Sequence, residues 1–175
     1  MAAKKTASAK PGRSAVRAPQ VGILMGSQSD WQLMQAAQKQ LEELGIACEA
    51  RVISAHRTPQ RLTAYLASAE ERGIQALICG AGHAAHLAGV TAAHTILPVL
   101  GVPLPSSDLQ GLDALLATVQ MPGGIPVATF ALGQSGARNA ALFAAAMLAR
   151  MDPALRRRLI AFREKQSASV PELPY

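Results

Sequence analysis

The chain's clearest candidates for chemistry are in residues 54–59, which have the sequence Ser-Ala-His-Arg-Thr-Pro. This hexapeptide follows an apolar run, Cys48 to Ile53, that is typical of a strand, and it precedes apolar residues at helical spacing. In open α/β sheets, ligands bind outside the carboxyl ends of the strands, where helix N-termini offer free N–H groups to anions. We therefore expect His56 and Arg57 to face a cleft. The alternative is a polar turn in which the threonine caps the helix and the proline begins it.

A second polar loop, Gly26-Ser27-Gln28-Ser29-Asp30, follows the apolar run Val21 to Met25. Apolar residues at helical spacing come after it, and Gly45 is placed to end that helix. The two hydroxyls and the carboxylate of this loop, next to a helix N-terminus, can hold a phosphate and a sugar diol together. The alternative is helix capping by Ser29 or Asp30 with Gln32, and capping and ligand binding can coexist.

A third loop, residues 80–89, has the sequence Gly-Ala-Gly-His-Ala-Ala-His-Leu-Ala-Gly and follows the apolar strand Ala76 to Cys79. Residues this small let the backbone approach a ligand closely. The loop also matches the pattern G-x-G-x-x-[GA] of dinucleotide-binding proteins, but we reject that interpretation. The fingerprint belongs on the first strand of its unit and needs an acidic residue about 20 positions on, whereas the nearest acid here is Asp108.

The same loop contains His83 and His86, which are three positions apart and so could share a helix face as metal ligands. The sequence offers no evident third ligand nearby, and we therefore predict no metal site. His94 lies farther along the following helix, where we expect a structural or partly exposed side chain.

Two further segments, Ile96 to Val102 and Pro126 to Leu132, complete a set of five predicted strands that alternate with helices. This order predicts an α/β fold with a three-layer, flavodoxin-like or Rossmann-like five-stranded parallel sheet and right-handed crossovers. An extra C-terminal helix begins at Asp152-Pro153. Ahead of it, Asn139 to Leu148 has no polar face, and we expect contact between subunits to cover this helix.

The 175 residues are enough for one sizeable core, and we divide them into a disordered basic tail (1–20), a single α/β domain (21–167) and a C-terminal tail (168–175). Five basic and no acidic residues occupy the first twenty positions, which leaves 12 basic and 11 acidic residues in the rest. Because residues 21–175 are nearly neutral overall, they provide no basic surface stripe for nucleic acid, and we expect no nucleic-acid function.

No run approaches the ~20 apolar residues of a membrane span, so we expect no membrane association. Cys48 and Cys79 fall inside predicted strands without a metal-ligand spacing, which indicates buried, reduced thiols. A cytoplasmic location fits these features best.

Five motifs in order closely resemble the PurE family, the 5-(carboxyamino)imidazole ribonucleotide mutases of purine biosynthesis. The resemblance spans about residues 21 to 165 and leaves the basic tail outside. The motifs are Met25-Gly26-Ser27-Gln28-Ser29-Asp30-Trp31, Ser54-Ala55-His56-Arg57-Thr58-Pro59, the Gly80 to Gly89 loop, Val119-Gln120-Met121-Pro122-Gly123-Gly124-Ile125-Pro126 and Asn139-Ala140-Ala141-Leu142.

The resemblance implies a homo-octamer without cofactor or metal, with sites at subunit contacts. It implies that a small-molecule ribonucleotide is the substrate and that its carboxylate moves from the exocyclic nitrogen to ring carbon 4. Transient hand-over of the unstable carbamate from a partner synthetase is an open question at this point. By position, His56 matches the catalytic acid/base. The matching substrate-binding positions are Ser29, Ser54 and Arg57 for the phosphate, Asp30 for the ribose, and Ser27, Ala81, Gly82 and His86 for the base and its migrating carboxylate.

The third loop departs from the family's usual Gly-Ala-Gly-Gly-Ala-Ala-His-Leu-Pro-Gly at two positions, His83 and Ala88. Two other functions therefore remain open beside the mutase: a carboxylase that takes carbon dioxide directly onto aminoimidazole ribonucleotide, and a non-catalytic nucleotide-binding paralogue. The retained His86-Leu87 pair and the Gln120-Met121-Pro122 segment favour the mutase.

Overall fold

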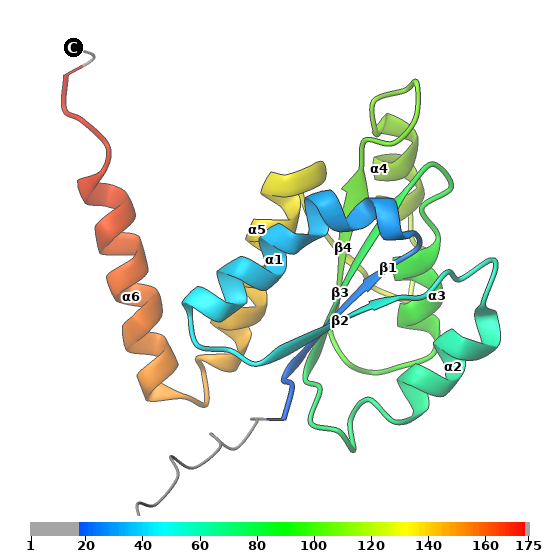
Figure 1. Ribbon diagram of the computed structural model, residues 1–175, viewed down its shortest axis with the longest axis horizontal. Coiled ribbons are helices and arrows are strands. Elements are labelled where there is room, and N and C mark those ends of the chain that lie inside the picture. Colours follow the sequence, from blue (N-terminus) through cyan, green and yellow to red (C-terminus); the bar gives the residue numbers. More distant parts are fainter. Residues whose placement is uncertain (1–17, 174–175) are drawn as a thin grey trace, which may run out of the picture.

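The structure is a computed structural model that describes residues 18–173. Most of the predicted basic tail (1–20) and the last two residues of the predicted C-terminal tail (168–175) lie outside the described residues. The α/β domain predicted for residues 21–167 lies entirely within them, and it folds around one sheet (Figure 1).

The five-stranded parallel sheet that the sequence predicts is confirmed, and its strand order β2-β1-β3-β4-β5 is the flavodoxin-like one of the two predicted alternatives. From β1 the chain moves outward to β2, then returns past β1 and builds the rest of the sheet on the other side. The strands are β1 (Val21–Met25), β2 (Cys48–Val52), β3 (Ala76–Gly82), β4 (Val99–Leu104) and β5 (Ala128–Thr129).

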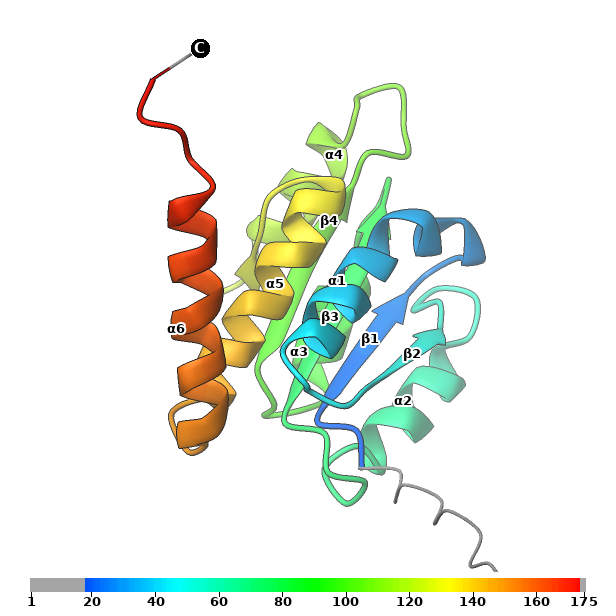
Figure 2. The same cartoon turned by 60° about the vertical axis from the view of Figure 1, so that its left-hand side comes forward.

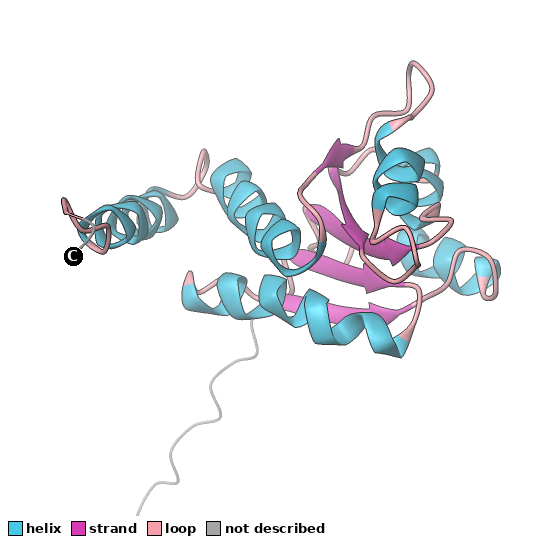
Figure 3. Ribbon diagram, turned by 90° about the horizontal axis from the view of Figure 1, so that it is seen from above, coloured by secondary structure: helices cyan, strands magenta, loops and turns pink. Residues whose placement is uncertain are grey.

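Helices cover both faces of the sheet and make three layers (Figures 2 and 3). α1 and α5 pack against each other on one face, with α6 outside α5, while α2, α3 and α4 lie on the other face. The helices are η1 (Gln28–Asp30), α1 (Trp31–Glu43), α2 (Pro59–Ala67), α3 (Leu87–Ala93), α4 (Leu112–Val119), α5 (Gly133–Leu148) and α6 (Pro153–Ala168).

Each face of the sheet has its own apolar core. β1 and β4 are buried throughout, as strands covered on both faces must be. Ile23, Met34 and Leu41 belong to the core under α1 and α5, whereas Leu24 and Leu62 belong to the core under α2 and α3. These cores hold the carboxyl ends of β1 to β4 in fixed positions along one edge.

Two predicted strands are wrong in extent. The fourth begins at Val99 rather than Ile96, whose side chain is 93% exposed ahead of the strand. The fifth is confined to Ala128–Thr129, because only these residues pair with β4. An apolar run predicts burial or pairing but cannot say which of its residues the neighbouring strand reaches.

The apolar helix α5, for which the sequence predicts cover by a subunit contact, is covered on one face by the chain itself. Its small residues, among them Ala137, Ala141 and Ala145, are buried within the chain itself, where α5 packs closely along α1. Phe143 remains 48% exposed on the other side. The chain therefore buries the small-residue face of this helix without a subunit contact, and only the face with Phe143 is open.

The two cysteines also differ from each other. Cys79 is fully buried, whereas Cys48 is only half-buried at the sheet edge, contrary to the prediction that both are buried. Burial raises the pKa of Cys48 to about 11 and that of Cys79 to about 12, so both thiols stay protonated at neutral pH.

Candidate active site

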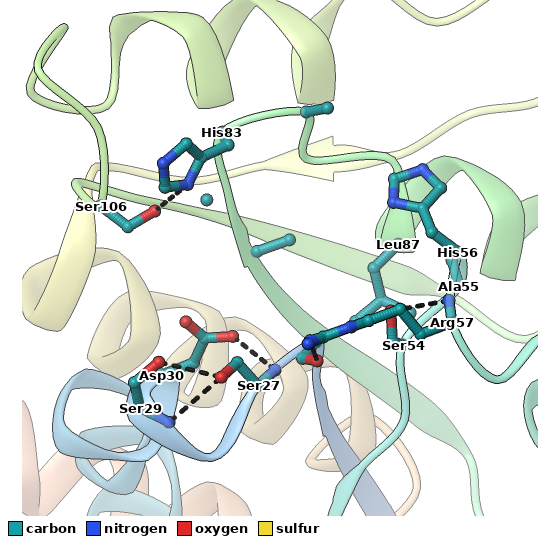
Figure 4. Close-up of a pocket in the computed structure, with 14 residues that line it drawn as sticks. Ser27, Ser29, Asp30, Ser54, Ala55, His56, Arg57, His83, Leu87 and Ser106 are labelled. Atoms are coloured by element: carbon teal, nitrogen blue, oxygen red, sulfur yellow. Dashed lines mark hydrogen bonds between the residues drawn. The ribbon is translucent and has the colours of Figure 1, made fainter.

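A pocket of about 380 Å³ opens at the carboxyl edge of the sheet, where the loops after β1, β2, β3 and β4 converge (Figure 4). This is the point where the strand order reverses, the usual ligand site of such sheets. It is large enough for a small molecule. Eight of the nine residues that the sequence predicts for the site line it: Ser27, Ser29, Asp30, Ser54, His56, Arg57, Ala81 and Gly82.

The loop after β1 is shaped by a capping box. The side chain of Ser27 accepts from the backbone N–H of Ser29, and the Asp30 carboxylate accepts from the N–H of Ser27 at 2.9 Å. The alternative of helix capping by Ser29 or Asp30 with Gln32 is wrong. Ser27 caps η1, and Asp30, at the N-cap position of α1, makes no side-chain capping bond to that helix. The Ser27 and Ser29 hydroxyls are 2.9 Å apart and lie at the pocket.

Asp30 is half-buried, and burial raises the pKa of its carboxyl group above the ordinary value of 3.8. The N–H of Ser27 and the positive charge of Arg57 act in the opposite direction, but desolvation is the largest effect. A partly desolvated carboxylate gains strong hydrogen bonds when a ligand's hydroxyls reach it.

The corner after β2 is closed on itself by Ser54 and Thr58. The Thr58 hydroxyl accepts from the N–H of Ser54 and donates to its carbonyl, both at 3.0 Å, so it does not cap α2 as predicted. Arg57 donates from its backbone N–H to the Ser54 hydroxyl and from Nη2 to the Gly26 carbonyl at 2.7 Å. These bonds tie the β2 corner to the β1 loop and leave other guanidinium N–H groups for a ligand.

His86, the ninth predicted residue, reaches the pocket only through His56. Its Nδ1 lies 2.9 Å from Nε2 of His56, and the two rings meet edge to face at 84°. His56 itself lines the pocket. The two imidazoles therefore form a hydrogen-bonded pair in which one nitrogen donates and the other accepts.

Sequence reasoning missed Ser106, which lines the pocket from the loop after β4 and lies 3.0 Å from His83 Nδ1 (Figure 4). The available signal was its place directly after a strand, the same rule that indicated the other loops. His94 lies at the end of α3, where it is exposed and its Nδ1 bonds the Val90 carbonyl.

In residues 18–173, no three His, Cys, Asp or Glu side chains come together in an arrangement suited to a metal ion. The helices of this same range include none long and apolar enough to cross a membrane.

Fold and pocket together define an α/β protein with a candidate small-molecule site at the switch point of its sheet, lined by hydroxyls and a guanidinium that suit an anionic ligand. Comparison with known proteins is more specific: the family model described as AIR carboxylase matches residues 20–169, and the chain belongs to this family.

Proteins named N5-carboxyaminoimidazole ribonucleotide mutase are similar over most of their length. The one from Brucella melitensis is 56% identical over 154 residues, which cover 88% of this chain and 95% of that protein. The one from Bacillus subtilis is 53% identical over 154 residues, with the same shares covered. Among solved structures, PurE from Treponema denticola superposes with a TM-score of 0.78 at 28% identity and covers 86% of this chain and 92% of that one.

Proposed function

We propose that this protein is a mutase of purine biosynthesis that converts N5-carboxyaminoimidazole ribonucleotide into 4-carboxy-5-aminoimidazole ribonucleotide. Its membership in the AIR carboxylase family and its identity above 50% to proteins named as this mutase support the proposal. The single observation that carries it is His56, an imidazole at the pocket wall whose Nε2 is held by His86 at 2.9 Å.

The ribonucleotide's phosphate binds between Ser29, Ser54 and Arg57. Hydroxyls and a guanidinium suit this group, since arginine offers paired N–H donors to phosphate oxygens. The ribose hydroxyls then donate to Asp30, on the same loop as Ser29. The base and its carboxylate lie over Ala81, Ser27 and Gly82, the predicted base-contact residues that line the pocket. His86, also predicted to contact the base, acts instead through His56.

The chemistry is a decarboxylation followed by a recarboxylation. In the first step, protonation of the exocyclic nitrogen breaks its bond to the carboxyl carbon and releases carbon dioxide beside the base. In the second, ring carbon 4 attacks that carbon dioxide, and a base removes the proton that carbon 4 still carries. One proton is donated and one is recovered, so the reaction balances without metal, hydride carrier or covalent nucleophile.

His56 performs both proton transfers. Imidazole is the side chain best suited to donate a proton in one step and accept one in the next near neutral pH. Because Nε2 of His56 faces His86, the ring nitrogen left for the substrate is Nδ1. His86 fixes the orientation of the ring, a function that a hydrogen-bonded neighbour commonly serves for a general base. When His86 accepts at Nδ1, a neutral His56 carries its hydrogen on Nε2 and its Nδ1 is free to act as the base.

The assembly we propose is a homo-octamer with sites at subunit contacts, in the cytoplasm. Support comes from a row of apolar side chains along α4. Leu112, Leu116 and Val119 are each about half exposed, at 55%, 51% and 49%. Spacing of four and three residues puts them on one side of the helix. A contiguous exposed apolar surface of this kind marks contact with another protein.

Hand-over of the carbamate from its synthetase is also part of the proposal. The Dictyostelium discoideum protein named bifunctional purine synthesis protein purC/E is 53% identical over 156 residues, which make up only 16% of it. A segment like this chain thus occurs beside a second purine-synthesis activity in one polypeptide, an arrangement that suits transfer of an intermediate between two activities.

A second candidate function is direct carboxylation of aminoimidazole ribonucleotide, which the description of the matched family favours. Purified protein should be given each substrate separately: the carbamate without added bicarbonate, and the aminoimidazole ribonucleotide with dissolved carbon dioxide. The mutase consumes the carbamate rapidly, above the rate of a blank without enzyme. Turnover of the second substrate alone would identify the carboxylase, and binding without turnover of either would identify a non-catalytic paralogue.

A further inference from the structure

The β3–α3 loop is tethered on both sides of the pocket by its two histidines. His86 bonds His56 in the β2 corner, and His83 bonds Ser106 in the loop after β4. Ala85, which lies between them in the chain, is buried. The loop therefore spans the pocket between two hydrogen bonds, one to each neighbouring loop.

The hydrogen bond between His83 and Ser106 lies in a tightly packed part of the structure. His83 has a φ of +52°, a left-handed conformation that residues with a Cβ adopt only when their surroundings hold them there; Gln110 is the one other non-glycine residue in the described part of the chain that shares it. A Cβ added to the preceding residue, Gly82, would collide with the Ser106 hydroxyl. Ser106 thus lies directly against the end of β3.

The loop after β4, which contains Ser106, is held by hydrogen bonds of its own. Next to Ser106, the Ser107 hydroxyl donates to the Asp113 carboxylate at 2.9 Å and accepts from the N–H of Leu109 at 3.2 Å. Ser106 also donates its backbone N–H to the Leu104 carbonyl at 2.9 Å. His83 is therefore bonded to an ordered connection, and both His83 and Ser106 form part of the pocket wall (Figure 4).

We propose that His83 is a positioning residue that, through Ser106, holds the β3–α3 loop closed over the pocket, so that carbon dioxide stays beside the base between the two chemical steps. This inference rests on the proposed mutase function. When the loop opens, carbon dioxide leaves and dissolved carbon dioxide enters in its place. The bonds made and broken are unchanged, but the carboxyl carbon of the product then comes from solution.

The proposal is tested by single turnover of unlabelled carbamate in buffer containing isotopically labelled carbon dioxide and bicarbonate, with the label in the product as the readout. Loss of one neutral hydrogen bond should increase the fraction of protein molecules with an open β3–α3 loop roughly 2- to 10-fold. We expect Ser106→Ala and His83→Gly to raise the labelled fraction by that factor. Ser106→Thr keeps the hydroxyl and should stay near the unsubstituted protein.

His94→Ala is the matched control, because His94 is an exposed histidine at the other end of α3, outside the pocket. It should leave the labelled fraction unchanged. In the double variant of His83→Gly and Ser106→Ala, the labelled fraction should be no larger than in the more affected single variant. Both substitutions remove the same hydrogen bond, so their effects should not add.

Equal label in the Ser106→Ala variant and the unsubstituted protein, with both turning over the carbamate, would overturn the His83 proposal and leave the mutase intact. Product labelled fully in the unsubstituted protein, or no conversion by it, would instead overturn the mutase function.

Discussion

Nε2 of His56 and Nδ1 of His86 are 2.9 Å apart, although the two residues are 30 positions apart and belong to different loops. Only one of these nitrogens can carry a hydrogen when the bond is made. When His56 is an imidazolium, His86 must therefore accept at Nδ1 and carry its own hydrogen on Nε2. His86 thus orients the ring of the proposed catalytic group, and acceptance at its Nδ1 is compatible with His56 carrying a hydrogen on both ring nitrogens.

Replacement of His86 by Phe should lower turnover by about tenfold or more, equivalent to ~1.4 kcal/mol in the transition state, with little change in KM. His86→Asn, whose amide can still bond His56, should recover part of the loss. Steady-state kinetics across pH 5.5–8.5 provide the measurement. Adding His86→Phe to a His56→Asn variant should cost nothing more, because residues that act as a unit are non-additive. Full activity of His86→Phe at every pH would remove His86 from the mechanism.

Replacement of Arg57 by Ala should raise the substrate's dissociation constant about 30-fold, or ~2 kcal/mol, because it removes a charge that faces the phosphate. Arg57→Lys should recover only part of this affinity, since lysine keeps the charge but not the paired N–H groups. Calorimetric titration with the product nucleotide provides the measurement. Unchanged affinity in Arg57→Ala would rule out the phosphate assignment.

The sequence predicted the strand-end loops better than it predicted the elements between them. His56, Arg57 and Asp30 come directly after apolar strands, and because the ends of parallel strands share one edge, their convergence follows from the fold class. The bond between His56 and His86 could not be predicted, because it depends on the side-chain conformations of two loops. Ser106 was missed because none of the five family motifs contains it, although it follows the fourth strand as the other site residues follow theirs.

Asp30→Asn should stabilise the fold at neutral pH. Because burial raises its folded-state pKa above 3.8, the folded protein binds this proton more tightly than the unfolded chain does. The contribution of Asp30 protonation to the free energy of unfolding is therefore fully present below pH 3.8, and it is lost as the pH rises through the folded-state pKa. The amide of the variant does not titrate, so its advantage in unfolding free energy should be present at pH 7 and shrink toward pH 4, as measured by urea unfolding.

Asp113→Asn should have the opposite effect and is the matched control. The Ser107 hydroxyl holds the pKa of Asp113 below 3.8, so this carboxylate stabilises the fold above pH 3.8 and its loss should destabilise at pH 7.

The Asp30→Asn variant should also bind nucleotide ~10-fold or more weakly, because it loses a charged hydrogen-bond acceptor. Destabilisation by Asp30→Asn at pH 7 would contradict the burial argument.

Light scattering should give a mass near that of eight chains, the assembly that the family resemblance implies. Leu116→Glu, in the exposed row on α4, should reduce the mass, because a buried unpaired charge opposes association. Val170→Glu is the matched control, since Val170 is similarly apolar and 68% exposed but lies beyond α6. A single chain at micromolar concentration in the unsubstituted protein would contradict the proposed octamer.

The most direct test of the central claim is turnover of N5-carboxyaminoimidazole ribonucleotide by the unsubstituted protein and by the His56→Asn variant, measured beside product-nucleotide binding. General acid/base groups contribute ~100- to 10,000-fold, so we predict that His56→Asn loses at least ~100-fold in turnover while its affinity for the nucleotide stays within about threefold. Near-normal turnover by His56→Asn would contradict the account, because the proton transfers would then belong to another group.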